Sequence, residues 1–70
     1  MRPGDLRRFH DIVFGYRDPS FSGMMFMVIG RHPPEIEGMS HGVTIMIGNK
    51  VSDWSERVLL NYSEVVSEAG

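Results

Sequence analysis

The sequence predicts a single small all-β domain in which five short strands curl into a barrel. The first reason is that short apolar segments are separated by turn residues, mostly Gly, Pro and Ser, along the whole chain of 70 residues. The second is that residues 43–47 alternate between two faces and precede Gly48-Asn49, which is typical of a tight hairpin. Closing a sheet of such short strands protects their edges. A chain of this length cannot hold two cores, so we expect one domain over residues 1–70.

The first expected strand lies within Leu6–Val13, after the turn residues Pro3-Gly4-Asp5. A helix is the alternative, because Asp5 could cap it and apolar residues recur there at i, i+3 and i+7. The β-branched and aromatic residues at positions 12–14 favour a strand. We favour the strand and leave the helix open.

Met24–Ile29 is the second expected strand, between a loop at residues 15–22 and Gly30. It consists of six consecutive apolar residues, whereas a half-buried strand would alternate and a membrane span would need about 20 apolar residues. Each barrel strand has one inward and one outward face, so either register leaves three large apolar side chains outside. Burying each would contribute about 1.5–3 kcal/mol. Residues 31–42, which contain Pro33-Pro34, should form a second loop.

The last three strands are expected in the second half of the chain. Val43–Ile47 should pair with Lys50–Trp54 through the glycine hairpin. Residues 55–57 then turn the chain, residues 58–60 give it a short apolar anchor, and a last strand follows within residues 62–67.

Charged residues are divided unevenly along the chain, whose net charge is −2. Residues 1–31 contain five arginines against three aspartates, and residues 32–70 contain two cations against six carboxylates. Such a split could attract a polyanion to one end or let subunits meet head to tail. The absence of cysteine excludes disulfides and thiolate zinc sites, and raises the expectation of a homo-oligomer. No apolar leader follows Met1, so we expect a soluble, cytoplasmic protein without membrane contact.

The apolar excess of the second strand favours an interaction or assembly module that contacts a second copy or another protein. The candidate contact residues are Met24, Met25, Phe26, Met27, Ile29 and Trp54. Methionine suits an adaptable binding face. The alternative is a cover from the same chain, either the loop of residues 14–21 or the loop that contains Ile36.

Trp54 has two further possible roles. With Phe9 and Tyr62 it could line an aromatic groove for proline-rich peptides. It could also close one end of the core.

Nucleic-acid binding is the alternative function. It requires cations along the phosphate path and flat side chains for stacking. The first 31 residues supply both types, in Arg7, Arg8, Arg17, Arg31, Phe9 and Tyr16. The acidic net charge and the single lysine count against it.

The remaining polar residues do not predict catalysis or a cofactor. His10, His32 and His41, with Glu35 and Glu37, lack the close spacing of metal ligands and are expected to be exposed. Ser40 and His41 are sequence neighbours and would point to opposite faces of a strand. No glycine-rich loop opens a helix, which excludes the common phosphate-binding motif. We therefore expect no enzymatic activity, no metal and no cofactor.

The order of these features resembles small Src-homology-3-like barrels, in particular the short KOW-like proteins of tailed and marine phages. The resemblance depends on Gly4-Asp5 before a basic strand, the long apolar strand Met24–Ile29, the glycine hairpin after Val43–Ile47, and the terminal segment Ser63–Glu68. It implies a small barrel and, for a phage-encoded protein, a place in the host cytoplasm or the virion, and it bears on the fold more than on the function. The chain departs from the pattern at residues 32–41 and 57–62.

The Sm-like barrel, which begins with a helix and assembles into rings, is the alternative family. The Asp and Asn residues that hold RNA bases in those rings have no clear counterpart here. This second resemblance therefore concerns the fold alone.

Overall fold

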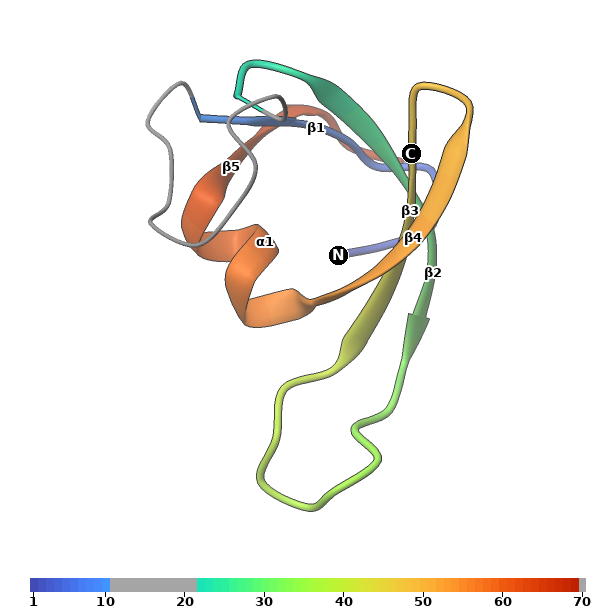
Figure 1. Ribbon diagram of the computed structural model, residues 1–70, viewed down its shortest axis with the longest axis vertical. Coiled ribbons are helices and arrows are strands. Elements are labelled where there is room, and N and C mark those ends of the chain that lie inside the picture. Colours follow the sequence, from blue (N-terminus) through green and yellow to red (C-terminus); the bar gives the residue numbers. More distant parts are fainter. Residues whose placement is uncertain (11–21, 70) are drawn as a thin grey trace.

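The computed structural model describes residues 1–10 and 22–69 (Figure 1). Over these residues the chain forms five strands and one short helix: β1 (Leu6–Phe9), β2 (Met25–His32), β3 (Gly42–Ile47), β4 (Lys50–Ser55), α1 (Glu56–Tyr62) and β5 (Ser63–Ser67). The strands form one antiparallel sheet in the order β4-β3-β2-β1-β5. The chain therefore runs as a meander from β1 to β4, continues through α1, and returns beside β1 as β5.

The sheet is curved but open, so the prediction of a closed barrel is wrong. Among the described strands, β4 and β5 are the two edges and are not paired with each other. Helix α1 lies between them in Figure 1 and contacts both. The seven residues that join β4 to β5 form this helix, and its buried residue Leu59 packs in the core.

The core lies on the inner, concave side of the sheet. Alternate residues of β2 and β3 point inward, and Trp54 from β4 and Leu59 from α1 complete the cluster. The ring of Phe9 is central, since its centroid lies 4.8 Å from that of Phe26 and 5.2 Å from that of Trp54. Tilted aromatic contacts of this kind stabilise a core beyond the area they bury.

The first segment is a strand at Leu6–Phe9, which confirms the strand over the helix for these four residues. Residues 11–13 of the predicted segment Leu6–Val13 lie outside the described residues. The turn before the strand is formed at Gly4, whose φ of 96° lies in the left-handed region that favours glycine. The amide of Gly4 donates to the carbonyl of Val28, so this turn is also fixed to β2.

Helix α1 was not predicted, because residues 55–57 were interpreted as a turn and residues 58–60 as an anchor. The prediction that this segment anchors the chain to the core is confirmed, since Leu59 is completely buried and Val58 packs against the core. Tyr62 packs on the same cluster at position i+3 from Leu59, which is helical spacing. Glu56 in the first turn suits the positive end of the helix dipole. The helical spacing of Leu59 and Tyr62 can be seen in the sequence, but a segment of seven residues is too short to show a clear helical periodicity.

The predicted hairpin is confirmed. Ile47 pairs with Lys50, so the turn contains only Gly48 and Asn49, and Gly48 has a φ of 61°. The boundary of the preceding loop was wrong, because β2 extends through Arg31 and His32 and the loop begins at residue 33. A register shift between Val28 and Gly30 lets β2 continue past its apolar stretch.

Candidate interaction surface

The outer face of the sheet carries a continuous row of apolar side chains across four strands. Leu6 of β1 is paired with Met27 of β2, Met27 with Met46 of β3, and Met46 with Val51 of β4. Directly paired residues on one face lie within side-chain contact distance. We call these four residues the apolar row. None of the four carries a charge, and each comes from a different strand.

Much of the apolar row is exposed to solvent. Met27 is 46% exposed, Met46 43% and Val51 59%, while Leu6 is half-buried. Met25 and Ile29 are on β2 beside the row and are exposed to a similar degree, and Met24 precedes them at 39%. Of the two registers expected from the sequence, β2 adopts the one with Phe26 and Val28 inward and Met25, Met27 and Ile29 outward. Met24, which was expected inward with Phe26 and Val28, is exposed instead.

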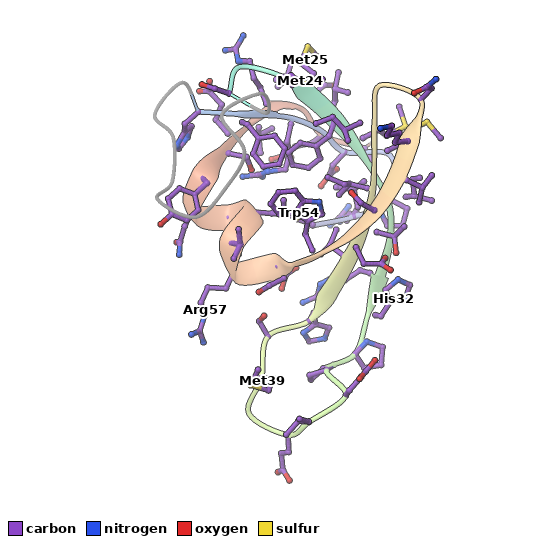
Figure 2. All side chains as sticks on the ribbon, viewed as in Figure 1. Met24, Met25, His32, Met39, Trp54 and Arg57 are labelled. Atoms are coloured by element: carbon purple, nitrogen blue, oxygen red, sulfur yellow. The ribbon has the colours of Figure 1, made fainter. Side chains whose placement is uncertain are left out.

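The loop of residues 33–41 does not cover this face. Its two large apolar residues, Ile36 and Met39, are 68% and 62% exposed and bury little against anything. Figure 2 shows Met39 on the projecting loop, far from Met24 and Met25 at the other end of the view. The other predicted cover, the loop of residues 14–21, lies outside the described residues. Within residues 1–10 and 22–69, the outer face is thus left open.

Two of the predicted contact residues belong to the core instead. Phe26 is 1% exposed and Trp54 is 8% exposed, so neither can serve as a surface anchor in this conformation. The same burial contradicts an aromatic peptide groove made by Phe9 and Trp54, because their rings pack against each other. Trp54 instead closes the core, and its indole N–H donates to the Ser52 hydroxyl at 2.9 Å.

The predicted nucleic-acid residues are mostly occupied by contacts within the protein. Arg8 forms an ion pair with Glu64, at 2.9 Å between Nη2 and Oε1, across β1 and β5. Phe9 is in the core, so the prediction that it stacks on bases is wrong. Arg7 is buried and Arg31 is paired with a carboxylate, as described below. Arg17 and Tyr16 lie outside the described residues.

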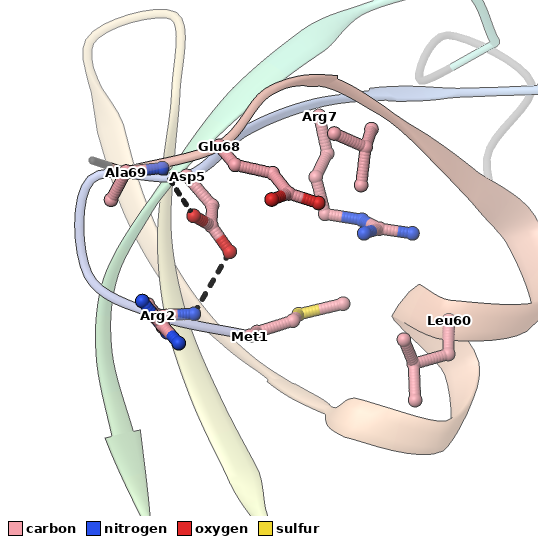
Figure 3. A pocket seen from close by; sticks show the side chains of 8 residues that line it. Met1, Arg2, Asp5, Arg7, Leu60, Glu68 and Ala69 are labelled. Atoms are coloured by element: carbon pink, nitrogen blue, oxygen red, sulfur yellow. Dashed lines mark hydrogen bonds between the residues drawn. The ribbon is translucent and has the colours of Figure 1, made fainter.

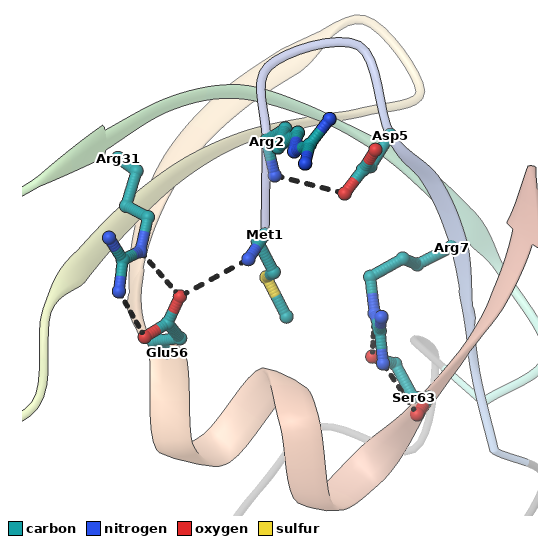
Figure 4. Close-up of polar contacts among 7 residues, drawn as sticks. All are labelled: Met1, Arg2, Asp5, Arg7, Arg31, Glu56 and Ser63. Carbon is teal, nitrogen blue, oxygen red and sulfur yellow. Dashed lines mark hydrogen bonds and ion pairs between the residues drawn. The ribbon is translucent and has the colours of Figure 1, made fainter. Parts of the chain in front are cut away.

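Arg31 joins β2 to the start of α1 (Figure 4). Its Nε and Nη2 donate to the two carboxylate oxygens of Glu56 at 2.7 and 3.1 Å, and the ammonium of Met1 lies 3.5 Å from the same carboxylate. Hydrogen bonds from Arg31 lower the pKa of Glu56, and the same contact raises the pKa of Arg31. The pair fixes the first turn of the helix to the sheet.

Arg7 and Asp5 fix the C-terminal strand to β1 from the inner side. The Nε of Arg7 donates to the Ser63 hydroxyl at 2.8 Å and its Nη2 to the Ser63 carbonyl at 3.0 Å, while that hydroxyl donates to the carbonyl of Leu59. The carboxylate of Asp5 accepts from the amides of Ala69 at 2.8 Å and Arg2 at 2.9 Å. These backbone hydrogen bonds, that from Ala69 above all, lower the pKa of Asp5.

These polar groups line a cavity of about 300 Å³ between β1, β5 and α1 (Figure 3). Asp5 and Arg7 contribute to its wall, together with Met1, Leu60 and Val65. Arg2 and Glu68 also line it. Asp5 and Arg7 already have hydrogen-bond partners within the protein.

A second hollow of about 490 Å³ lies between the 33–41 loop and the end of β4. Two of its lining residues, His32 and Asp53, are joined through Thr44, whose Oγ1 accepts from Nε2 of His32 at 2.7 Å and donates to Asp53 at 2.5 Å. The hydroxyls of Ser40 and Ser55 are 2.7 Å apart, which ties the loop to β4. Because Thr44 uses its proton on Asp53, His32 carries a proton on Nε2 in this arrangement.

Among the residues described, no three His, Asp or Glu side chains gather as a metal site would require. Outside residues 11–21 and 70, no helix is long and apolar enough to cross a membrane. No protein-family model, curated protein or solved structure matches the chain. The phage origin, the cytoplasmic location and the lack of enzymatic activity therefore stay predictions.

Proposed function

We propose that this domain is a non-catalytic interaction module with a Src-homology-3-like fold that associates with a second copy of itself through the outer face of its sheet. The observation that carries the proposal is the exposed apolar row across β1 to β4. The fold assignment is supported by the order of elements, because four strands form a meander and a fifth returns after a helical segment to pair with the first.

The energetic argument starts from the methionines. Fully burying such a side chain contributes about 1.5–3 kcal/mol, and Met27 and Met46 each retain nearly half of their surface in water. Covering the exposed part is thus worth on the order of 1 kcal/mol per side chain. In a symmetric dimer each exposed apolar side chain is buried in both copies. Burial of the outer face therefore contributes on the order of 10 kcal/mol of favourable free energy, against an association cost of about 4–15 kcal/mol. We expect a dimer whose population depends on protein concentration.

The charge distribution favours a second copy as the occupant. A two-fold interface brings each patch against the same patch of its partner, so an uncompensated charge at its centre would meet its own copy. The apolar row is uncharged, and Arg8 beside it is neutralised by Glu64. The edge of the face carries both signs, with Asp53 on β4 and the Arg8–Glu64 pair on the opposite side.

The size of the face is also adequate. A standard interface covers about 800 Å² of each partner, which is about one sixth of the 4766 Å² accessible surface of this domain. One broad side of a body that measures 31 × 31 × 20 Å can supply that area. Stacking two such sheets would bury the methionines of both copies against each other, and their flexible side chains can adapt to the contact.

Sedimentation velocity from micromolar to submillimolar concentration tests the proposal. We expect the unmodified protein to shift from monomer to dimer, and Met27→Glu and Met46→Glu to remain monomeric, because each would bury an unpaired carboxylate at the interface. Met39→Glu is the matched control, since it makes the same change at an exposed methionine on the 33–41 loop. Circular dichroism verifies that all variants are folded.

Either of two results would overturn the proposal. One is an unmodified protein that stays monomeric over the whole range. The other is a dimer that Met27→Glu and Met39→Glu weaken equally, which would place the contact away from the outer face.

A further inference from the structure

Methionine is concentrated on the outer face of the sheet. Met25, Met27 and Met46 have between 43% and 46% of their surface exposed, and Met27 and Met46 are direct cross-strand partners. The side chain of Met1, by contrast, is 1% exposed. Met39 is exposed but on the separate loop. Met24, which directly precedes β2, is 39% exposed. The chain therefore carries thioethers in four settings: on the proposed interface, directly before it, in the interior, and on an unrelated surface.

We infer that Met25, Met27 and Met46 form an oxidation site whose conversion to methionine sulfoxide dissociates the self-associated form. The inference builds on the proposed function, because it assigns a regulation to the same face. The oxidant belongs to the class of hydroperoxides. The chemistry needs only an accessible sulfur lone pair, and no metal or cofactor takes part.

The reaction balances with hydrogen peroxide alone. The thioether sulfur forms a bond to one peroxide oxygen, the O–O bond breaks, and the second oxygen leaves as water after taking up the proton of the first. The sulfur is oxidised by two electrons and the peroxide is reduced by two. The product is a polar, chiral sulfoxide in place of a flexible apolar group.

Sulfoxides on this face would oppose association, because burial is favourable for an apolar thioether and unfavourable for a polar sulfoxide. A polar S=O group buried without a hydrogen-bond donor loses its hydration, and the apolar row has no donor side chain to replace it. Arg8, the cross-strand partner of Met25, already donates to Glu64. Met27 and Met46 are paired, so oxidation of both places two sulfoxides side by side. We expect the dissociation constant of the dimer to rise by about tenfold or more.

Association must in turn protect the same sulfurs. If sulfoxide formation weakens the dimer, then dimer formation slows sulfoxide formation, because only the monomer presents these methionines to peroxide. The oxidation rate of Met25, Met27 and Met46 should thus fall as protein concentration rises. Met39 should react at a rate independent of protein concentration, and Met1 should react slowly throughout.

The experiment combines peroxide treatment, tandem mass spectrometry that assigns each sulfoxide, and sedimentation velocity on the same samples. We expect untreated protein to dimerise and protein oxidised at the three interface methionines to be monomeric. Treatment with the two methionine sulfoxide reductases, one for each epimer, should restore the dimer. A variant with Met25→Leu, Met27→Leu and Met46→Leu should dimerise and keep doing so after the same exposure, although its Met39 is oxidised.

The outcomes separate the two proposals. An untreated protein that is monomeric at all concentrations overturns the proposed function and this inference with it. An untreated dimer that persists after oxidation of Met25, Met27 and Met46 overturns only this inference. So does a triple leucine variant that dissociates on peroxide treatment as readily as the unmodified protein, because another sulfur would then be responsible.

Discussion

Replacing Leu59 by alanine should remove a large part of the stability of this domain. Leu59 is completely buried and is the buried residue of α1, on which the partly buried Val58 and Tyr62 add further core contacts. A buried Leu→Ala change costs about 2–5 kcal/mol, depending on how far the cavity collapses. At about 0.05–0.15 kcal/mol per residue, a domain of 70 residues has a total stability of about 4–10 kcal/mol. A seven-residue helix is too short to persist alone, so the helical signal should disappear with the anchor.

Leu60 supplies the matched control, because it is the next residue of the same helix and is 53% exposed. Leu60→Ala should cost about 1 kcal/mol or less. The assay is urea unfolding followed by tryptophan fluorescence, since Trp54 is in the same cluster as Leu59. Leu59→Met, which nearly conserves volume, keeps the comparison possible if Leu59→Ala does not fold. Equal losses for Leu59→Ala and Leu60→Ala would refute the assignment of the buried helix face.

Two further predictions concern the contacts that fix β5 to β1. Ser63→Ala should lower the free energy of unfolding by about 1–3 kcal/mol in urea titrations, because the buried Arg7 loses a hydroxyl acceptor; no change would mean that water satisfies Arg7. Asp5→Asn should destabilise the protein at pH 7, since an amide oxygen replaces a carboxylate that accepts two backbone N–H groups. The folded state lowers the pKa of Asp5, so its contribution is complete above the unfolded value and is lost as pH falls through the folded one. The difference between Asp5→Asn and the unmodified protein should therefore shrink in urea titrations below about pH 4, and a difference independent of pH would contradict the account.

Most of the strands could be predicted from local chemistry. The alternation of Val43–Ile47 and the left-handed preference of Gly48 specify a hairpin whatever surrounds them. The six apolar residues Met24–Ile29 specify a strand with an apolar outer side, because a strand turns successive side chains to opposite faces. The ends of the strands were harder to predict. Arg31 and His32 extend β2 because they pair with β3, and not because of an intrinsic preference for strand structure.

The candidate interaction surface could likewise be predicted only in part. That Met25, Met27 and Ile29 would share a face follows from strand periodicity alone. Strand periodicity does not decide which face is buried, because both faces of Met24–Ile29 are equally apolar. The aromatic contact of Phe26 with Phe9 decides which face packs in the core. Arg7, Arg8 and Arg31 were grouped as cations because the sequence places them together, whereas the fold directs them to Ser63, Glu64 and Glu56.

The sequence by itself determined a small β-rich fold, its hairpin, and an excess of apolar residues in its second strand, since these depend on local periodicity and turn chemistry. Only the tertiary structure decided that the sheet stays open, that α1 separates its edges, and that Leu6, Met27, Met46 and Val51 align into one row. The physical reason is that the row depends on the pairing registers of three successive strand pairs, in which Leu6 pairs with Met27, Met27 with Met46 and Met46 with Val51, and no local pattern encodes these registers.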